Sequence, residues 1–170
     1  MKYLAMRQVA LNGDVLMVEG RGLFSTLIRV LTGQQISHVA LLVWIDTTLW
    51  VAEMKEGIGY RLQPASLWVE DVLASGATLY YGTAPEQVLK RPADVRVEVL
   101  KHRQESYSYW SLLPVWWAQI TRRQITAGLV CSTFVQRIWE KTEYRFSQTA
   151  DPGDFLRLCG PVMALEADDA

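Results

Sequence analysis

The chain has 170 residues, of which half are hydrophobic and 21% are charged, and this composition excludes an intrinsically disordered protein. Lys and Arg together number 17 and Asp and Glu number 18, so there is no basic excess of the kind that binds nucleic acid. This length suits one domain with a sizeable core, and we predict a single domain over residues 1–170 with its core at about residues 12–158.

The cysteines and the N-terminal residues indicate the cellular compartment in which the protein is expected to work. Cys131 and Cys159 are too few for a disulfide framework and are not spaced as zinc ligands. The sequence shows no metal site and no nucleotide-binding loop, so no metal and no cofactor are expected. Free thiols fit a reducing compartment. Arg7 and Gln8 interrupt the first apolar run too early for a signal peptide, and no stretch reaches the roughly 20 apolar residues that span a bilayer. A cytoplasmic protein is therefore expected.

Turn signals divide the first half of the chain into short strands and two helices. Apolar residues at helical spacing predict helices over residues 23–32, ended by Gly33, and over residues 64–74. The run at residues 37–45 is almost continuously apolar, which is typical of a strand buried on both faces. Shorter runs between turn residues predict the other strands, at residues 15–18, 49–54, 60–62 and 78–81.

The second half is predicted to be mainly helical. Pro92 is a good first residue for a helix running to about Glu105, although alternating valines in the same stretch are also compatible with a strand. Helices over residues 107–113 and 131–139 follow, and residues 155–158 form a last short element before an acidic end that is expected to fray. This order indicates an α+β fold in which helices pack on an antiparallel sheet.

Cys131 is the first candidate catalytic residue. It follows Gly128 at the start of a helical pattern and shares a side with Phe134 and Ile138, so it points inward at a helix N-terminus. There the unpaired backbone N–H groups and the helix dipole favour an anion, and a nearby histidine can lower the pKa of such a thiol to roughly 3.5–7.5. The alternative is a small buried hydrophobe, because free cysteine is often fully buried.

A thiolate nucleophile needs a base, and the base needs an orienting partner. Of the two histidines, His38 opens the buried strand, whereas His102 lies among charged residues typical of a solvated helix face. Glu53 follows His38 by fifteen residues, and a hairpin of that length brings the end of its second strand beside the start of its first. Glu53 is therefore the predicted partner of His38, with Glu56 as a competitor. An ordinary surface carboxylate is the alternative for Glu53.

Several segments, in their order and spacing, resemble the circularly permuted branch of the NlpC-type cysteine peptidase superfamily, the YiiX/YebB-like papain-fold amidases. Four segments carry most of this resemblance: residues 13–16 (Gly-Asp-Val-Leu), 31–40 with a Ser-His-Val-Ala end, 51–58 with Glu ahead of Gly-Ile, and 130–135 (Val-Cys-Ser-Thr-Phe-Val). Tyr107-Ser108-Tyr109 and Asp151-Pro152-Gly153-Asp154 resemble two further segments of the family. In this branch the histidine precedes the cysteine, the reverse of papain's order.

The resemblance implies a permuted papain-like fold and a thiol hydrolase or acyltransferase acting on an amide, ester or thioester. Cys131 would attack the carbonyl, His38 would take and return the proton, and Glu53 would orient His38. The backbone N–H of Cys131 would be among the donors to the oxyanion. Relatives act on peptidoglycan stem peptides, amide-linked amino acids or lipid acyl groups, which implies a peptide, peptidoglycan-fragment or acyl substrate. Thr133 stands where relatives often carry Glu, and Ala40 where they often carry Gly, which leaves the substrate pocket open.

Aromatic residues ahead of the cysteine helix form a second candidate site. Tyr107, Tyr109 and Trp110 are candidate substrate-binding residues. Trp110, Trp116 and Trp117 are candidates for contact with a membrane surface or a partner protein, and packing of the helical layer on the sheet is the alternative.

Three functions are therefore open from the sequence. The first is an amidase acting through an acyl-enzyme on Cys131, and the second is a lipid acyltransferase or thioesterase. The third is an inactive module that binds a ligand or partner through the tryptophans. Arg21 and Arg29 are candidates for binding a substrate carboxylate, with simple solvation as the alternative.

Overall fold

The computed structural model describes residues 1–102 and 130–168, and its centre is a six-stranded sheet with the order β4-β3-β2-β1-β5-β6. The strands are β1 (Val15–Glu19), β2 (His38–Ile45), β3 (Thr48–Lys55), β4 (Gly59–Pro64), β5 (Thr78–Gly82) and β6 (Val162–Leu165). Every pairing between neighbouring strands is antiparallel. This confirms the predicted α+β class with helices on an antiparallel sheet.

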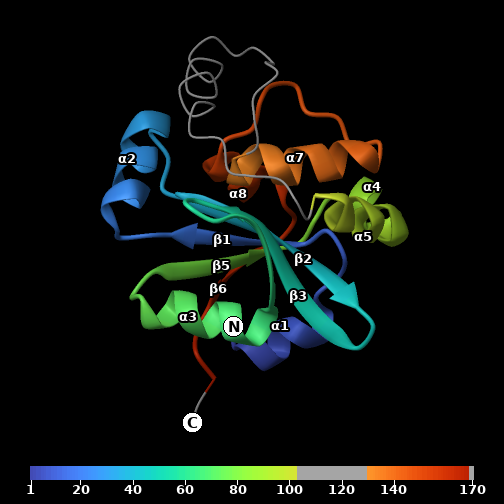
Figure 1. The fold of residues 1–170 in the computed structure, drawn as a ribbon, viewed down its shortest axis with the longest axis horizontal. Helices are drawn as coiled ribbons and strands as arrows, with labels where there is room; N and C mark the ends of the chain where they lie inside the picture. Colours follow the sequence, from blue (N-terminus) through green and yellow to red (C-terminus); the bar gives the residue numbers. More distant parts are fainter. Residues whose placement is uncertain (103–129, 169–170) are drawn as a thin grey trace.

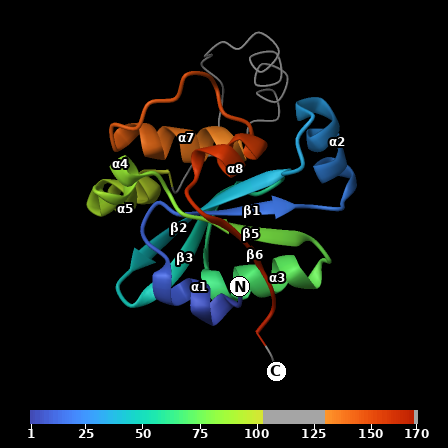
Figure 2. The same ribbon diagram turned by 180° about the vertical axis from the view of Figure 1, so that it is seen from behind.

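Helices cover both faces of the sheet and give three layers (Figures 1 and 2). They are α1 (Tyr3–Val9), α2 (Leu23–Thr32), α3 (Ala65–Ala74), α4 (Glu86–Leu89), α5 (Pro92–Lys101), α7 (Cys131–Lys141) and α8 (Phe155–Leu158), with a 3-10 turn at Pro152–Asp154. The helices α4, α5, α7 and α8 lie on one face, and α1 and α3 lie on the other. The helix α2 projects from the end of β1, just before the chain enters β2.

Alternating side chains of the central strands fill two separate cores, as the period of two along a strand requires. From β1, Val15 and Met17 join the core under α7, whereas Leu16 and Val18 join the core over α3. The strand β2 divides its side chains between the same two cores. The strand β2 is thus buried on both faces, which confirms the interpretation of the continuous apolar run at residues 37–45.

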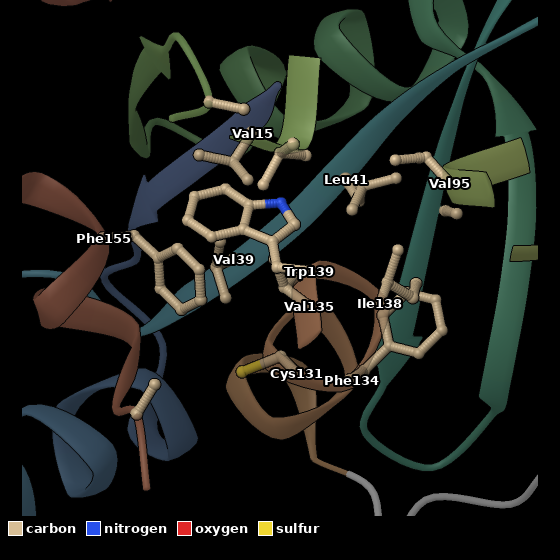
Figure 3. Packing of buried hydrophobic residues seen from close by; sticks show 14 of the residues in the cluster. Val15, Val39, Leu41, Val95, Cys131, Phe134, Val135, Ile138, Trp139 and Phe155 are labelled. Carbon is tan, nitrogen blue, oxygen red and sulfur yellow. The ribbon is translucent and has the colours of Figure 1, made fainter. Parts of the chain in front are cut away.

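The helix α7 is docked on the sheet by the apolar side predicted from its sequence. Figure 3 shows Trp139 of α7 beside Val15, Val39 and Phe155, with Cys131 at the first turn of the same helix. The indole Nε1 of Trp139 donates a hydrogen bond to the carbonyl oxygen of Gly13 at 3.0 Å. Packing and this bond together fix where the first turn of α7 lies relative to the sheet.

Three elements of the structure were not predicted from the sequence: α1, α4 and β6. In α1 only Met6 is buried, and α4 and β6 have four residues each, so their patterns are too short to detect. The helix predicted from Pro92 is confirmed as α5 up to Lys101. The helix ends there with His102 as its C-cap. Residues 103–105 of the predicted continuation and the helix predicted over residues 107–113 lie outside the described residues. Within the described part of the chain, no helix has the length and apolar character that crossing a membrane requires.

Candidate active site

His38 and Glu53 meet across the β2–β3 hairpin. Leu41 pairs with Ala52 in this register, which places His38 diagonally across from Glu53 on the same face of the sheet. The imidazole Nε2 of His38 lies 2.6 Å from Oε2 of Glu53. Glu53 is only 2% exposed, so it is not an ordinary surface carboxylate. The fifteen-residue spacing therefore does bring the two side chains together.

Arg61 holds the other oxygen of the Glu53 carboxylate. The two residues are directly paired between β3 and β4, and Nε of Arg61 donates to Oε1 of Glu53 at 2.6 Å. Burial by itself would raise the pKa of Glu53, but the hydrogen bond and charge of His38, the charge of Arg61 and the indole of Trp68 lower it below its ordinary value. Glu53 is thus held as a carboxylate between two cationic partners.

Cys131 completes the group as the first residue of α7, with its thiol within hydrogen-bond reach of His38. Burial lowers the pKa of His38. The charge and hydrogen bond of Cys131 and the contact with Glu53 outweigh burial and raise this pKa above its ordinary value. Since Nε2 faces Glu53, the other ring nitrogen is left for the thiol. The structure therefore connects Cys131, His38, Glu53 and Arg61 in one series.

The start of α7 is shaped by Thr133. Its Oγ1 accepts a hydrogen bond from the backbone N–H of Val130 at 3.0 Å and lies 3.3 Å from the carbonyl oxygen of the same residue. This closes the turn ahead of the cysteine and gives Thr133 a structural role. The backbone N–H of Cys131 lies in the first turn, where N–H groups have no acceptor within the helix. It is therefore placed to donate a hydrogen bond to the oxyanion of a carbonyl group that the Cys131 sulfur attacks.

The two competing candidates, Glu56 and His102, take other positions. Glu56 lies in the exposed turn between β3 and β4, and it is Glu53 that contacts His38. The expectation that His102 lies on a solvated helix face is wrong. Its side chain is buried at the end of α5 and packs edge-on against Phe134, with ring centroids 5.5 Å apart. The reason is that this end of α5 packs against α7.

Two segments that resemble the family are structural in this protein. The buried carboxylate of Asp14 accepts hydrogen bonds from the hydroxyl of Tyr81 and the backbone N–H of Ala84, which ties the turn before β1 to the end of β5. In the turn at residues 151–154, Asp151 and Asp154 each accept a hydrogen bond from the backbone N–H of the other. All the aromatic candidates predicted from the sequence lie outside the described residues: Tyr107, Tyr109, Trp110, Trp116 and Trp117.

A cleft of about 430 Å³ opens beside His38 and Glu53. Buried apolar side chains line it, among them Val18, Ile28 and Trp68. Charged side chains line it as well: Arg21, Lys55, Glu56 and Arg61. Neither Arg61 nor Trp68 was predicted from the sequence as a site residue, although counting outward from the turn between β3 and β4 places Arg61 opposite Glu53.

A metal centre is not indicated by the described residues. Across residues 1–102 and 130–168, no three His, Cys, Asp or Glu side chains are grouped so that they could hold a metal ion. The site instead consists of a thiol, an imidazole, a carboxylate and a guanidinium, each in contact with the next.

Comparison with known proteins gives a likeness in structure only. No protein-family model matches the chain, and no curated protein matches it. Among solved structures it is similar to the metalloprotein YiiX from Escherichia coli O157:H7, with a TM-score of 0.59 and 14% sequence identity over 78% of this chain and 66% of that one. The two chains share a fold. This chain spans about two thirds of the length of YiiX, and the resemblance to YiiX-like proteins is confirmed at the level of fold.

Proposed function

We propose that the protein is a cysteine-dependent hydrolase of the permuted NlpC-type, papain-like class, which cleaves an amide bond through an acyl-enzyme on Cys131. The observation that carries the proposal is the contact series from Cys131 through His38 to Glu53. A nucleophile, a base and an orienting carboxylate in this order are what nucleophilic catalysis requires. No cofactor is needed for this chemistry.

The acylation half of the reaction uses the charges that the site favours. The raised pKa of His38 favours an imidazolium beside the sulfur of Cys131, and the proposed reaction starts from the thiolate form of that sulfur. The sulfur attacks the substrate carbonyl carbon and forms a C–S bond, while the carbonyl oxygen takes negative charge and accepts a hydrogen bond from the backbone N–H of Cys131. The imidazolium then gives its proton to the leaving nitrogen as the C–N bond breaks. An amine leaves and the acyl group stays on the sulfur as a thioester.

The deacylation half returns the enzyme to its starting state. Neutral His38 takes a proton from water, whose oxygen attacks the thioester carbonyl. The C–S bond then breaks and the acid leaves. The proton that His38 took from water stays on the ring, so the thiolate and the imidazolium of the starting state are restored. Through both halves Glu53 keeps the ring in place and stabilises its charged form, and Arg61 keeps Glu53 ionised.

A lipid acyltransferase or thioesterase is a second candidate, favoured by the apolar part of the cleft lining at Val18, Ile28 and Trp68. It would use the same acyl-enzyme with another acceptor or leaving group. An inactive binding module is disfavoured, because such a module has no need of a buried thiol–imidazole–carboxylate series. The free thiols of Cys131 and Cys159 agree with work in a reducing compartment such as the cytoplasm.

The test is the reactivity of Cys131 toward iodoacetamide as a function of pH, in the wild type and in His38→Ala. Cys159 is the internal control, because burial raises the pKa of its thiol to about 12. We expect Cys131 to react as a thiolate at a pH where a free thiol is protonated, and to lose this advantage in His38→Ala. The ultraviolet absorbance of the thiolate gives the same ionisation without dependence on reagent access. A Cys131 that ionises like a free thiol in both proteins would exclude the proposal.

A further inference from the structure

The cleft beside His38 presents more positive than negative charge. Glu53 is its most buried acid, but both of its oxygens are occupied, one by His38 and one by Arg61. What remains on the lining is Arg21 and Lys55 against Glu56 alone.

Arg61 supplies fixed donors on the same lining. A guanidinium carries five N–H groups in a rigid plane, and only the Nε–H of Arg61 has an acceptor in the described part of the chain. Its side chain is 23% exposed and lines the cleft. The ion pair with Glu53 already orders this side chain, so a ligand that binds the remaining N–H groups does not have to order it.

Lys55 and Arg21 add charge that is not used elsewhere. Neither has an ion-pair partner among residues 1–102 and 130–168. Arg29 differs, because its guanidinium donates to the carbonyl of Gly20 and lies 3.9 Å from Glu19. Of the two arginines considered from the sequence, Arg21 is therefore the one available to a ligand in the cleft.

We propose that this cleft binds a carboxylate of the substrate, so that the substrate is an acyl or peptidyl group that carries a carboxylate besides its scissile carbonyl. The proposal rests on the proposed hydrolase function of Cys131. Arg21, Lys55 and the remaining N–H groups of Arg61 pair with the carboxylate. The apolar side chains of Val18, Ile28 and Trp68 contact the short chain that leads to it. Glu56 favours a singly charged carboxylate over a doubly charged phosphate.

The test compares matched alkylating reagents at Cys131. N-bromoacetyl-glycine, N-bromoacetyl-β-alanine and the next longer homologue carry a carboxylate at increasing distance, and their primary amides serve as neutral partners. In each case the thiolate displaces bromide and forms a C–S bond. We expect the acid to react faster than its amide by about tenfold at the best length, relative to the same ratio at glutathione.

Two double variants separate the cleft from the general attraction of an anion to the imidazolium of His38. In Arg21→Gln with Lys55→Gln, we expect the acid-to-amide ratio to fall severalfold while the rate with the amides changes little. Arg96→Gln with Lys141→Gln removes two exposed cations that do not line the cleft and should keep the wild-type ratio. An unchanged ratio in the first double variant would overturn the proposal.

Binding of an unreactive ligand keeps the two proposals distinguishable. N-acetyl-β-alanine and its amide are titrated into the wild type and both double variants by calorimetry. Preference for the acid that disappears only in the Arg21 and Lys55 variant supports the cleft even if Cys131 proves unreactive. A reactive Cys131 with no preference for the acid in either measurement refutes the carboxylate site and leaves the hydrolase proposal standing.

Discussion

At the scale of single residues, Glu53 is the centre of the site because it contacts cations through both of its oxygens. Its contact with His38 raises the pKa of that ring, so the folded state holds the imidazolium to higher pH than an exposed histidine would. The charge and hydrogen bond of Glu53 are therefore part of what sets the pH above which the imidazolium of His38 is lost.

We predict that Glu53→Gln lowers the pKa of His38 by about one unit, which corresponds to roughly 1.4 kcal/mol. The imidazolium is then lost at lower pH, so the pH range in which His38 can act as a proton donor narrows from its alkaline side. The measurement is a titration of the ring by nuclear magnetic resonance, which is simple because the chain has two histidines. Glu70→Gln, on the exposed side of α3, is the control and should leave the pKa unchanged. An unshifted pKa in Glu53→Gln would contradict the assignment of Glu53.

The sequence could indicate Cys131, His38 and Glu53 because each has a local signal: a helix start, the start of a buried strand and a hairpin spacing. It could not choose between Glu53 and Glu56, because that choice depends on where the turn after β3 falls. Arg61 and Trp68 were missed for the same reason. Their roles come from the β3–β4 register and from α3 packing over the carboxylate, which are tertiary facts.

At the scale of elements, the turn at residues 151–154 has a buried acid that opposes folding above its pKa. Burial and the neighbouring charge of Asp154 raise the pKa of Asp151 from 3.8 to about 6. The folded state therefore binds this proton more tightly than the unfolded state, and the free energy of unfolding falls as pH rises from about 4 through 6.

We predict that Asp151→Asn is more stable than the wild type above pH 6 by on the order of 1–3 kcal/mol, and equally stable near pH 4. Asparagine keeps the oxygen that accepts the N–H of Asp154 but carries no charge. Denaturant unfolding of both proteins across this pH range measures the difference. Asp46→Asn, at an exposed turn with a positive φ that asparagine also tolerates, is the control. A difference that does not vary with pH would contradict the raised pKa.

The same turn packs closely on the segment that leads into β2. A Cβ at Gly153 would lie 2.6 Å from both Cβ and Cγ of Gln34, so one of the two segments must move. We predict that Gly153→Ala lowers the free energy of unfolding by about 1–3 kcal/mol. Gly160→Ala is the matched control, since its Cβ would meet Thr83 at an ordinary 3.7 Å. Equal effects of the two substitutions in denaturant unfolding would show that the close contact is absent.

At the scale of the whole molecule, the order of the elements along the chain separates two parts that meet in space. His38 and Glu53 come from the first half and Cys131 from the second, and the ends of the chain lie together. The amino group of Met1 donates to the carbonyl of Ala164 at 2.7 Å, and the N–H of Glu166 donates to the carbonyl of Met1 at 2.9 Å. Composition and strand signals predicted the α+β class, but they could not predict this contact because it forms between residues more than 160 positions apart.

The adjacency of the ends predicts that the fold tolerates a change of chain order. We expect a circular permutant whose ends are joined by a short Gly/Ser linker, and which is opened between Lys90 and Arg91, to fold cooperatively. Both residues at the opening are exposed, lie between α4 and α5, and do not line the cleft. In this permutant Cys131 precedes His38 and Glu53, which is the order of papain.

The measurements are denaturant unfolding and the alkylation rate of Cys131, which we expect within about threefold of the parent because the contacts of the site do not depend on chain order. A second permutant, opened between Leu41 and Leu42, breaks the central strand that is buried on both faces and should not fold. If the first permutant folds and Cys131 keeps its alkylation rate, the packing of the helices on the sheet is sufficient to form the site, whatever the chain order. If it folds but loses the reactivity of Cys131, the placement of α7 against β2 depends on the native connection, and the prediction is wrong.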